Sequence, residues 1–196
     1  MEVKRKMTVD TEMFELGDII SFKLTTGEKV QARAVQETPE GMLFMTVDCL
    51  KDEQPMFNNP DGMGSVEICY FNSDLRHTLN KEILATFPEE IRSRMVGMRI
   101  GNTDTFDLLR IPTEKEIFGE NEYGQEEGKV KQFKGMRDRR NRIAWQGSKT
   151  NTWEYYWLQN RVPDTASDFA YVADYGPAGF DYASDSIGVR PVFLLS

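Results

Sequence analysis

The strongest local concentration of charge in the sequence is the basic stretch 129–142, "KVKQFKGMRDRRNR". It sets seven Lys or Arg residues against the single acid Asp138, in a chain whose net charge is −8. Guanidinium groups bind carboxylate and phosphate oxygens through paired N–H donors. One interpretation is an anion patch, with the candidate residues Arg137, Arg139, Arg140 and Arg142. We favour the alternative, a solvated loop paired with nearby acids, because aromatic residues that could stack on bases are not interleaved.

Residues 163–186, which precede the last apolar run, have the composition of a recognition surface. They combine Tyr and Phe with Asp, Ser, Gly and Ala. Tyrosine gives a large contact area at low entropic cost, while Ser and Asp adapt their hydrogen bonds to a ligand. We predict ligand contacts in and beside this segment at Gln159, Asn160, Arg161, Tyr175, Asp181 and Tyr182. The alternative is that Tyr171 and Phe180 are core residues of short strands and the rest is ordinary turn chemistry.

The sequence offers little for catalysis or for metal binding. His77 is the only histidine, and one imidazole without a partner carries no catalytic geometry. The two cysteines, Cys49 and Cys69, form no C-x-x-C pattern and are too few for a disulfide framework. The Asp residues of the segment 163–186 do not follow the spacing of a calcium loop. We therefore expect a protein that is not an enzyme, with no catalytic residue, no metal and no cofactor.

The composition is that of one globular domain. Apolar residues make up 39% and charged residues 29% of the 196 residues, which suffices for a core without metal or disulfide staples. The net charge argues against general nucleic-acid binding, because phosphates are repelled. No apolar run is long enough to cross a bilayer, and the first residues lack the apolar core of a secretory signal. We therefore expect a cytoplasmic protein with no membrane partner.

Three strands are predicted near the start of the chain. Apolar and polar residues alternate over 20–24 and again over 30–34, and Gly27 lies between the two runs. This pattern predicts a β-hairpin. The nearly continuous apolar run 42–50 predicts a third, more deeply buried strand. A loop rich in Pro, Asn and Gly follows it.

Three helices have recognisable start and stop signals. The segment 73–87 has apolar residues four apart and begins at Ser73, a good N-cap, so it predicts an amphipathic helix. Pro88 ends that helix and starts a second one, which Gly97 is expected to terminate. The T-x-x-E capping box in "PTEKEIFG" predicts a third, short helix that ends at its glycine.

Six short motifs, each weak alone, occur in an order that is fairly specific and covers residues 17–195. They are "DCLKDEQP", "SDLRHTLN", "FPEEI", "PTEKE", "YYWLQN" and "GVRPVF". Together they resemble a family of mostly uncharacterised bacterial and phage proteins. That family is similar in pattern to the C-type-lectin-like fold shared by formylglycine-generating enzymes and by the variable proteins of diversity-generating retroelements.

The resemblance implies one C-type-lectin-like α+β domain over residues 17–196, after an N-terminal extension over 1–16. Its mixed or antiparallel sheet would have paired N- and C-terminal strands, and two main helices would pack on it. The apolar end of the chain would be the closing strand, with one face formed by Ile187, Val189, Phe193 and Leu195. Truncation after Gly188 is then expected to abolish folding. Arg190 would need carboxylate or carbonyl partners, and Pro191 an edge or a bulge.

The sequence differs from the family pattern at the positions from which ligand contacts and catalytic chemistry would be inferred. Residues 157–161 read W-L-Q-N-R where W-L-R-S-P is common, and Thr78 occupies a position that is often Trp. Formylglycine-generating enzymes hold copper with a late cysteine pair, whereas both cysteines here precede residue 70. We therefore expect a non-catalytic module that recognises a protein or a glycan through loops before the last strand. The alternative is an assembly component of a phage particle or cytoplasmic complex; an enzyme of unknown reaction is less favoured, and the oligomeric state stays open.

Overall fold

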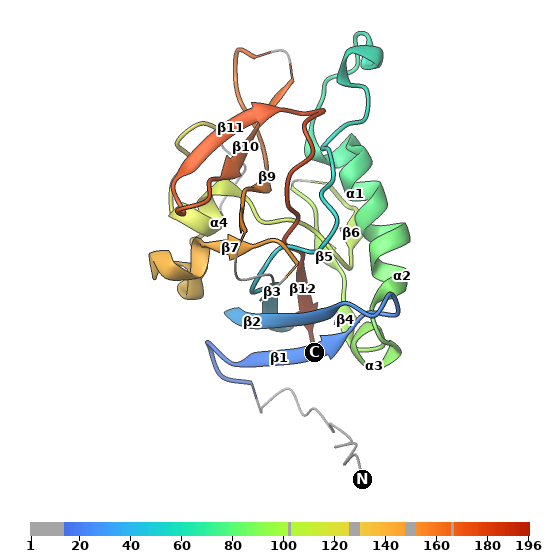
Figure 1. Cartoon of the computed structure of the whole chain (residues 1–196), viewed down its shortest axis with the longest axis vertical. Coiled ribbons are helices and arrows are strands. Elements are labelled where there is room, and N and C mark those ends of the chain that lie inside the picture. Colours follow the sequence, from blue (N-terminus) through green and yellow to red (C-terminus); the bar gives the residue numbers. More distant parts are fainter. Residues whose placement is uncertain (1–13, 102, 126–129, 148–151, 166) are drawn as a thin grey trace.

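The largest sheet of the structure has five strands in the order β1-β2-β3-β12-β4, and all neighbouring strands are antiparallel (Figure 1). The computed structural model describes residues 14–101, 103–125, 130–147, 152–165 and 167–196. The five strands are β1 (Ile19–Lys23), β2 (Lys29–Thr38), β3 (Gly41–Thr46), β12 (Val192–Leu195) and β4 (Met95–Val96). One sheet therefore joins segments from the beginning, the middle and the end of the described chain.

The predicted hairpin and buried third strand are both confirmed. Residues of β1 alternate between exposed and buried, and β1 pairs with β2 from Ile19 opposite Arg33 to Lys23 opposite Lys29. Gly27 in the turn has φ +96°, a left-handed conformation that favours glycine. Five of the six residues of β3 are buried, as the nearly continuous apolar run predicts.

The apolar end of the chain forms β12, which lies between β3 and β4. Alternate residues of β12 face two separate apolar clusters: Phe193 packs in the larger one and Leu194 in the smaller one. The strand is thus buried on both faces, and the expected closing strand is confirmed. The expected pairing of the first strand with the last is wrong, because short turns make β1, β2 and β3 pair in chain order and carry β1 to the edge.

The predicted amphipathic helix is one continuous helical stretch with a π-helical middle. It consists of α1 (Asp74–Thr78), η4 (Leu79–Ile83) and α2 (Leu84–Thr86), and the Ser73 side chain caps it by accepting from the backbone N–H of Arg76 at 3.1 Å. The next helix, α3 (Glu89–Arg92), ends well before Gly97. It is shorter than predicted because Met95 and Val96 leave the helix to pair with β12.

The short helix α4 (Glu114–Phe118) begins at the predicted capping box. Thr113 accepts from the backbone N–H of Glu116 at 3.2 Å, and the Glu116 carboxylate accepts from the backbone N–H of Thr113 at 2.9 Å. Gly119, with φ +89°, ends the helix as expected. Both signals are local in sequence, so the start and the end of this helix could be predicted from the residues alone.

A second sheet and two small hairpins complete the α+β structure, whose strands are mostly antiparallel. The second sheet has the order β11-β10-β9, with β9 (Tyr156–Arg161), β10 (Asp168–Val172) and β11 (Ala178–Tyr182). The hairpins are β5 (Met98–Arg99) with β6 (Phe106–Asp107), and β7 (Ala144–Trp145) with β8 (Trp153–Glu154). Single 3-10 turns lie at η2 (Pro60–Met63), η3 (Tyr70–Asn72), η5 (Lys134–Met136) and η6 (Arg139–Arg142).

Most of the expected N-terminal extension 1–16 lies outside the described residues. Phe14, at its described end, packs edge-on against Phe44 of β3 with the ring centres 4.9 Å apart. Across the ranges that the structure describes, no helix has both the length and the apolar character that a membrane crossing requires.

Candidate functional site

Five aromatic side chains from β7, β8, β10 and the adjoining loops form what we call the aromatic surface: Trp145, Trp153, Tyr155, Tyr171 and Tyr175. The rings of Trp145 and Trp153 stack at 3.9 Å, and Trp153 lies 5.5 Å from Tyr175. Tyr155 meets Tyr171 edge-on at 5.3 Å. Trp153 and Tyr155 are each 40% exposed and Tyr175 is 58% exposed. The rings thus contact one another in a group of three and a pair, and three of the five leave a large part of their area open to solvent.

The local backbone explains why these rings lie outside the core. Trp153 and Tyr155 point outward because the residue between them, Glu154, points inward. Gly179 lies opposite Tyr171, and a Cβ on it would be 2.7 Å from the Tyr171 ring, so only glycine leaves room for that ring. Arg139 donates from Nη2 to the carbonyl of Tyr175 at 3.0 Å and so fixes the loop between β10 and β11.

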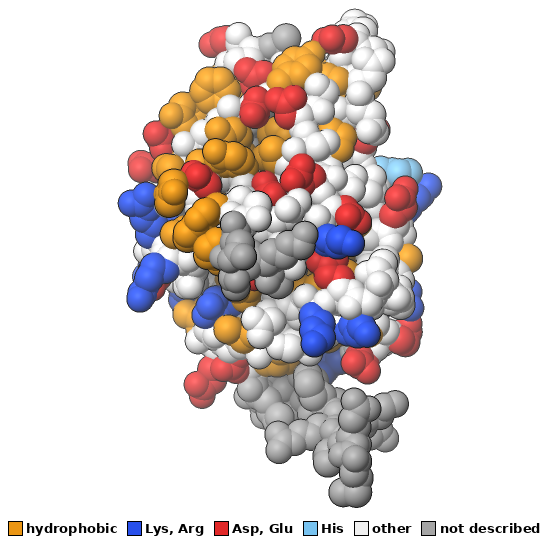
Figure 2. Space-filling view, in the orientation of Figure 1, with side chains coloured by type: hydrophobic (Ala, Val, Ile, Leu, Met, Phe, Trp, Pro, Cys, Tyr) orange, Lys and Arg blue, Asp and Glu red, His pale blue; other side chains and the backbone are white. Residues whose placement is uncertain are grey.

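Contiguous exposed aromatic area on a protein surface commonly marks a site of interaction. Figure 2 shows hydrophobic side chains gathered over β10, β11 and the β7–β8 hairpin, with acidic side chains between them and basic ones along one edge. A second ring pair, Phe180 of β11 with Tyr123, adds to the exposed area, with ring centres 5.1 Å apart. The face thus combines aromatic area with carboxylates that could accept hydrogen bonds.

Two carboxyl groups meet beneath the β7–β8 hairpin. Burial, and then the negative charge of nearby Glu53, raise the pKa of Glu154 to about 7. Glu53 in turn accepts a hydrogen bond from Nε2 of Gln146 at 2.9 Å. Glu154 can therefore exchange a proton near neutral pH, directly behind the exposed rings of Trp153 and Tyr155.

The structure separates the six predicted ligand contacts into exposed and interior positions. Tyr175 and Asp181 are exposed, and the half-buried Tyr182 donates from its hydroxyl to Oδ1 of Asp61 at 2.7 Å. Arg161 donates from Nη2 to the carbonyl of Thr165 at 2.9 Å. Of the six, only Tyr175 belongs to the aromatic surface, and ligand contact stays a prediction for all of them.

Gln159 and Asn160 lie in the interior of the protein. Nε2 of Gln159 donates to the carbonyl of Ile111. Asn160 accepts from the backbone N–H of Glu114 at 2.7 Å and donates to the carbonyl of Gln125 at 2.9 Å. These amides connect β9 to the start of α4 and to the loop after it, so their hydrogen bonds hold these segments of the fold together.

The described part of the basic stretch makes most of its contacts within the protein. Arg140 pairs with Asp138 at 2.7 Å, and Arg142 donates to the carbonyl of Met136 at 2.9 Å. Arg139 holds the Tyr175 loop, as described above, and Arg137 is exposed. Lys129 lies outside the described residues. An anion patch at these four arginines stays a prediction, and three of their side chains already have partners.

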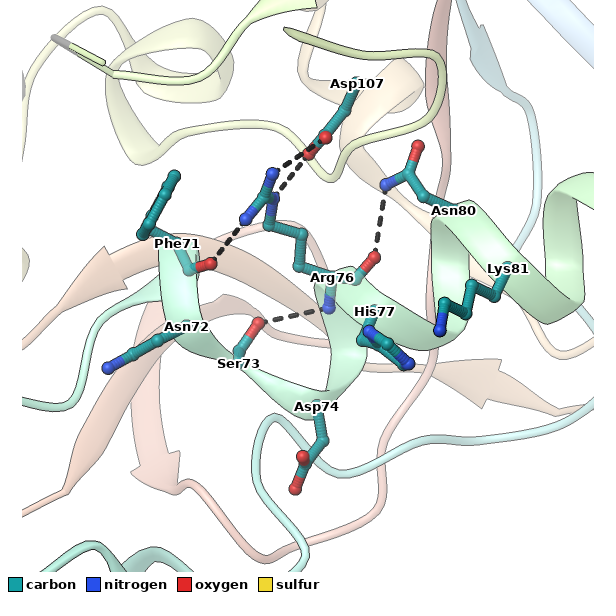
Figure 3. A pocket seen from close by; sticks show the side chains of 9 residues that line it. All are labelled: Phe71, Asn72, Ser73, Asp74, Arg76, His77, Asn80, Lys81 and Asp107. Carbon is teal, nitrogen blue, oxygen red and sulfur yellow. Dashed lines mark hydrogen bonds and ion pairs between the residues drawn. The ribbon is translucent and has the colours of Figure 1, made fainter. Parts of the chain in front are cut away.

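A second recessed region, which we call the helix pocket, lies beside the start of α1 (Figure 3). Its volume is about 440 Å³, and it is lined by Phe71, Asn72, Ser73, Asp74, Arg76, His77, Asn80, Lys81 and Asp107. The Arg76 guanidinium donates to both carboxylate oxygens of Asp107, at 2.6 and 2.9 Å, and to the carbonyl of Phe71 at 2.6 Å. It also lies over the Phe71 ring, 4.6 Å from the ring centre. These contacts hold one guanidinium in a single orientation.

Several residues of the sequence motifs connect separate segments of the fold. Oδ1 of Asn80 accepts from the backbone N–H groups of Leu108 and Leu109, each at 3.1 Å, and so fastens the helix to that segment. The buried Arg190 donates to the carbonyls of Thr46, Asn141 and Arg142, which confirms the expected carbonyl partners. Pro191 directly precedes β12, at a strand end.

Sequence reasoning missed Trp145, Trp153 and Tyr155 as surface residues. The alternation of "WEY" ordinarily predicts that the two aromatic residues face the core and that the acid faces solvent. The structure has the reverse, with Glu154 buried and both rings exposed. Within the described residues, no group of three His, Cys, Asp or Glu side chains is placed to hold a metal ion.

A family model described as a domain of unknown function (DUF6273) matches residues 49–196, which is more than half of the chain. Both the aromatic surface and the helix pocket fall inside the matched region. No curated protein and no solved structure matches the chain.

Proposed function

The chain belongs to the family of the domain of unknown function DUF6273, and we propose that it is a non-catalytic binding module that holds a protein or a glycan on the aromatic surface. The proposal includes a C-type-lectin-like fold and action in the cytoplasm. The observation that carries it is the exposure of Trp153, Tyr155 and Tyr175, three rings that contact other aromatic rings at the surface.

The geometry suits binding because the rings are held in place before a ligand arrives. Trp153 lies between Trp145 and Tyr175, so its ring has little freedom left to lose on association. Such a ring can stack on the C–H face of a sugar or on an apolar or cationic side chain of a protein. Polar groups beside the rings, such as the exposed Asp181, would then set the orientation of the ligand.

A glycan array tests the first ligand class. The wild-type protein is compared with the double variant Trp153→Ala/Tyr175→Ala and with Phe106→Ala, which removes an exposed aromatic ring from β6, outside the aromatic surface. The proposal predicts signals that the double variant loses and that Phe106→Ala retains. Signals that survive in the double variant would contradict binding at this surface.

Photo-crosslinking tests the second ligand class. A benzophenone amino acid replaces Tyr175 in one protein and Phe106 in another, and crosslinking is carried out in the cells that express them. A defined partner band at position 175 that is missing at position 106 supports a protein ligand. A blank array together with no band specific to position 175 would remove the proposal.

A further inference from the structure

The helix pocket is a second region built to hold a ligand, and it lies apart from the aromatic surface. In Figure 1, α1 runs along one side of the molecule and β10 and β11 lie on the other. The pocket volume of about 440 Å³ is in the range of sites for small molecules. The helix that lines the pocket is held in place, because Ser73 caps it and Asn80 accepts hydrogen bonds from the backbone of Leu108 and Leu109.

The two carboxylates of the pocket already accept hydrogen bonds from the protein. Asp107 accepts two hydrogen bonds from the Arg76 guanidinium and is buried. Asp74 turns away from the pocket centre in Figure 3 and accepts from the backbone N–H and the side-chain Nδ2 of Asn58, at 2.8 and 3.0 Å. Asp107 is thus paired with a cation, and Asp74 is directed to Asn58.

The positive groups of the pocket are less fully used. Three of the five N–H hydrogens of Arg76 have acceptors among the described residues, and its guanidinium points to Asp107, away from His77 and Lys81 (Figure 3). His77 and Lys81 are exposed, lie side by side in Figure 3, and have no side-chain hydrogen bond or ion pair with any part of the chain that the structure describes. The groups that lack partners in this pocket are therefore donors.

We infer that the helix pocket binds a small oxyanion, a carboxylate or a phosphate group, through Lys81 and His77. Charge-assisted hydrogen bonds from cationic donors to such oxygens are short and strong. The chain as a whole has a net charge of −8 and repels anions on average, so oxyanion binding has to come from a local arrangement of this kind. This inference is independent of the aromatic surface.

Isothermal titration calorimetry with inorganic phosphate and, separately, with citrate tests the inference on the full chain. The double variant His77→Gln/Lys81→Gln removes two exposed donors and leaves the Arg76 and Asp107 pair intact. Lys29→Gln, an exposed lysine of β2 outside the pocket, is the matched control. We expect at least one probe to bind the wild type and the control equally, and to bind the double variant at least tenfold more weakly at low salt.

The two probes distinguish the sources of the oxyanion. Binding of phosphate alone assigns the pocket to phosphate, and binding of citrate alone assigns it to carboxylates. A wild type that binds neither probe at low millimolar concentration overturns the inference, as does a folded double variant with unchanged affinity. Since these substitutions leave the aromatic rings untouched, failure here is separate from failure of the proposed function.

Discussion

The strand β12 and the aromatic surface both consist largely of apolar side chains, but the two regions place these side chains in different surroundings. In β12, Phe193 packs against the rings of Phe22, Phe44 and Phe87, and the strand is covered on both faces. In the aromatic surface, Trp153 and Tyr175 contact mainly other exposed rings. The first region is completed by the fold itself, whereas the second leaves contact area for another molecule.

The comparison teaches that stability and binding should be separable in this protein. Removing part of β12 exposes two apolar clusters at once, which costs a large share of the folding free energy. Removing a ring that is already half in water costs little stability. Changes at β12 should therefore affect stability most, and changes at the exposed rings least.

Truncation after Gly188 should have the largest effect. It deletes β12, the strand that pairs with both β3 and β4, so we expect complete loss of cooperative unfolding in thermal melts followed by circular dichroism. A chain that lacks only Ser196 is the control and should still melt cooperatively. A truncated protein with a sharp transition near that of the wild type would show that β12 is dispensable.

Gly188→Ala should have the next largest effect. A Cβ at this position would lie 2.5 Å from Cγ of Glu154 and 2.6 Å from Sγ of Cys49. We expect a loss of about 1–3 kcal/mol in unfolding free energy, the usual cost of overpacking a core, measured by denaturant titration. Ser186→Ala, at a nearby exposed position, should change stability by less than about 0.5 kcal/mol. Equal stability of the two variants would refute the close packing around Gly188.

Glu154→Gln should have a smaller effect that depends on pH. The pKa of Glu154 is raised from 4.5 to about 7 in the folded protein, so its contribution to stability is present below about pH 4.5 and is lost as the pH rises through 7. A neutral amide avoids this loss. We expect the variant to be more stable than the wild type by about 1–2 kcal/mol near pH 8.5, with the difference shrinking as the pH falls and vanishing below about pH 4.

The companion variant Glu53→Gln separates the contribution of the Glu53 charge from that of burial, which is the larger cause of the raised pKa. It removes the negative charge that helps to raise the pKa of Glu154, so the transition in stability should move to lower pH. A wild-type unfolding free energy that does not vary between pH 5 and pH 8.5 would contradict the buried carboxyl.

Local rules of sequence predicted the elements whose signals lie within a few residues. Ser73 and the Thr113–Glu116 capping box specify helix starts, and Gly27 specifies a turn. The predicted helix boundary was wrong where a contact with a distant segment of the chain determines the structure. Helix α3 ends early because β12, about a hundred residues further on, pairs with Met95 and Val96.

The surroundings of two candidate site residues could not be predicted from the sequence, for a related reason. Gln159 and Asn160 are polar, so sequence alone favours exposure. In the structure they lie in the interior, where their side-chain amides form hydrogen bonds with backbone groups of distant segments. Trp153 is aromatic, and sequence alone favours burial, yet it faces solvent because the neighbouring Glu154 faces inward. Side-chain type alone therefore misplaced both the interior polar groups and the surface rings.

The most direct test of the account measures stability and binding on the same protein, the Trp153→Ala/Tyr175→Ala double variant. The ligand is a glycan retained by the wild type on the array or a partner identified by crosslinking at position 175. We predict an unfolding free energy within about 1 kcal/mol of the wild type and affinity for that ligand at least tenfold weaker. A folded double variant that binds the ligand as tightly as the wild type would contradict the assignment of the aromatic surface as the binding site.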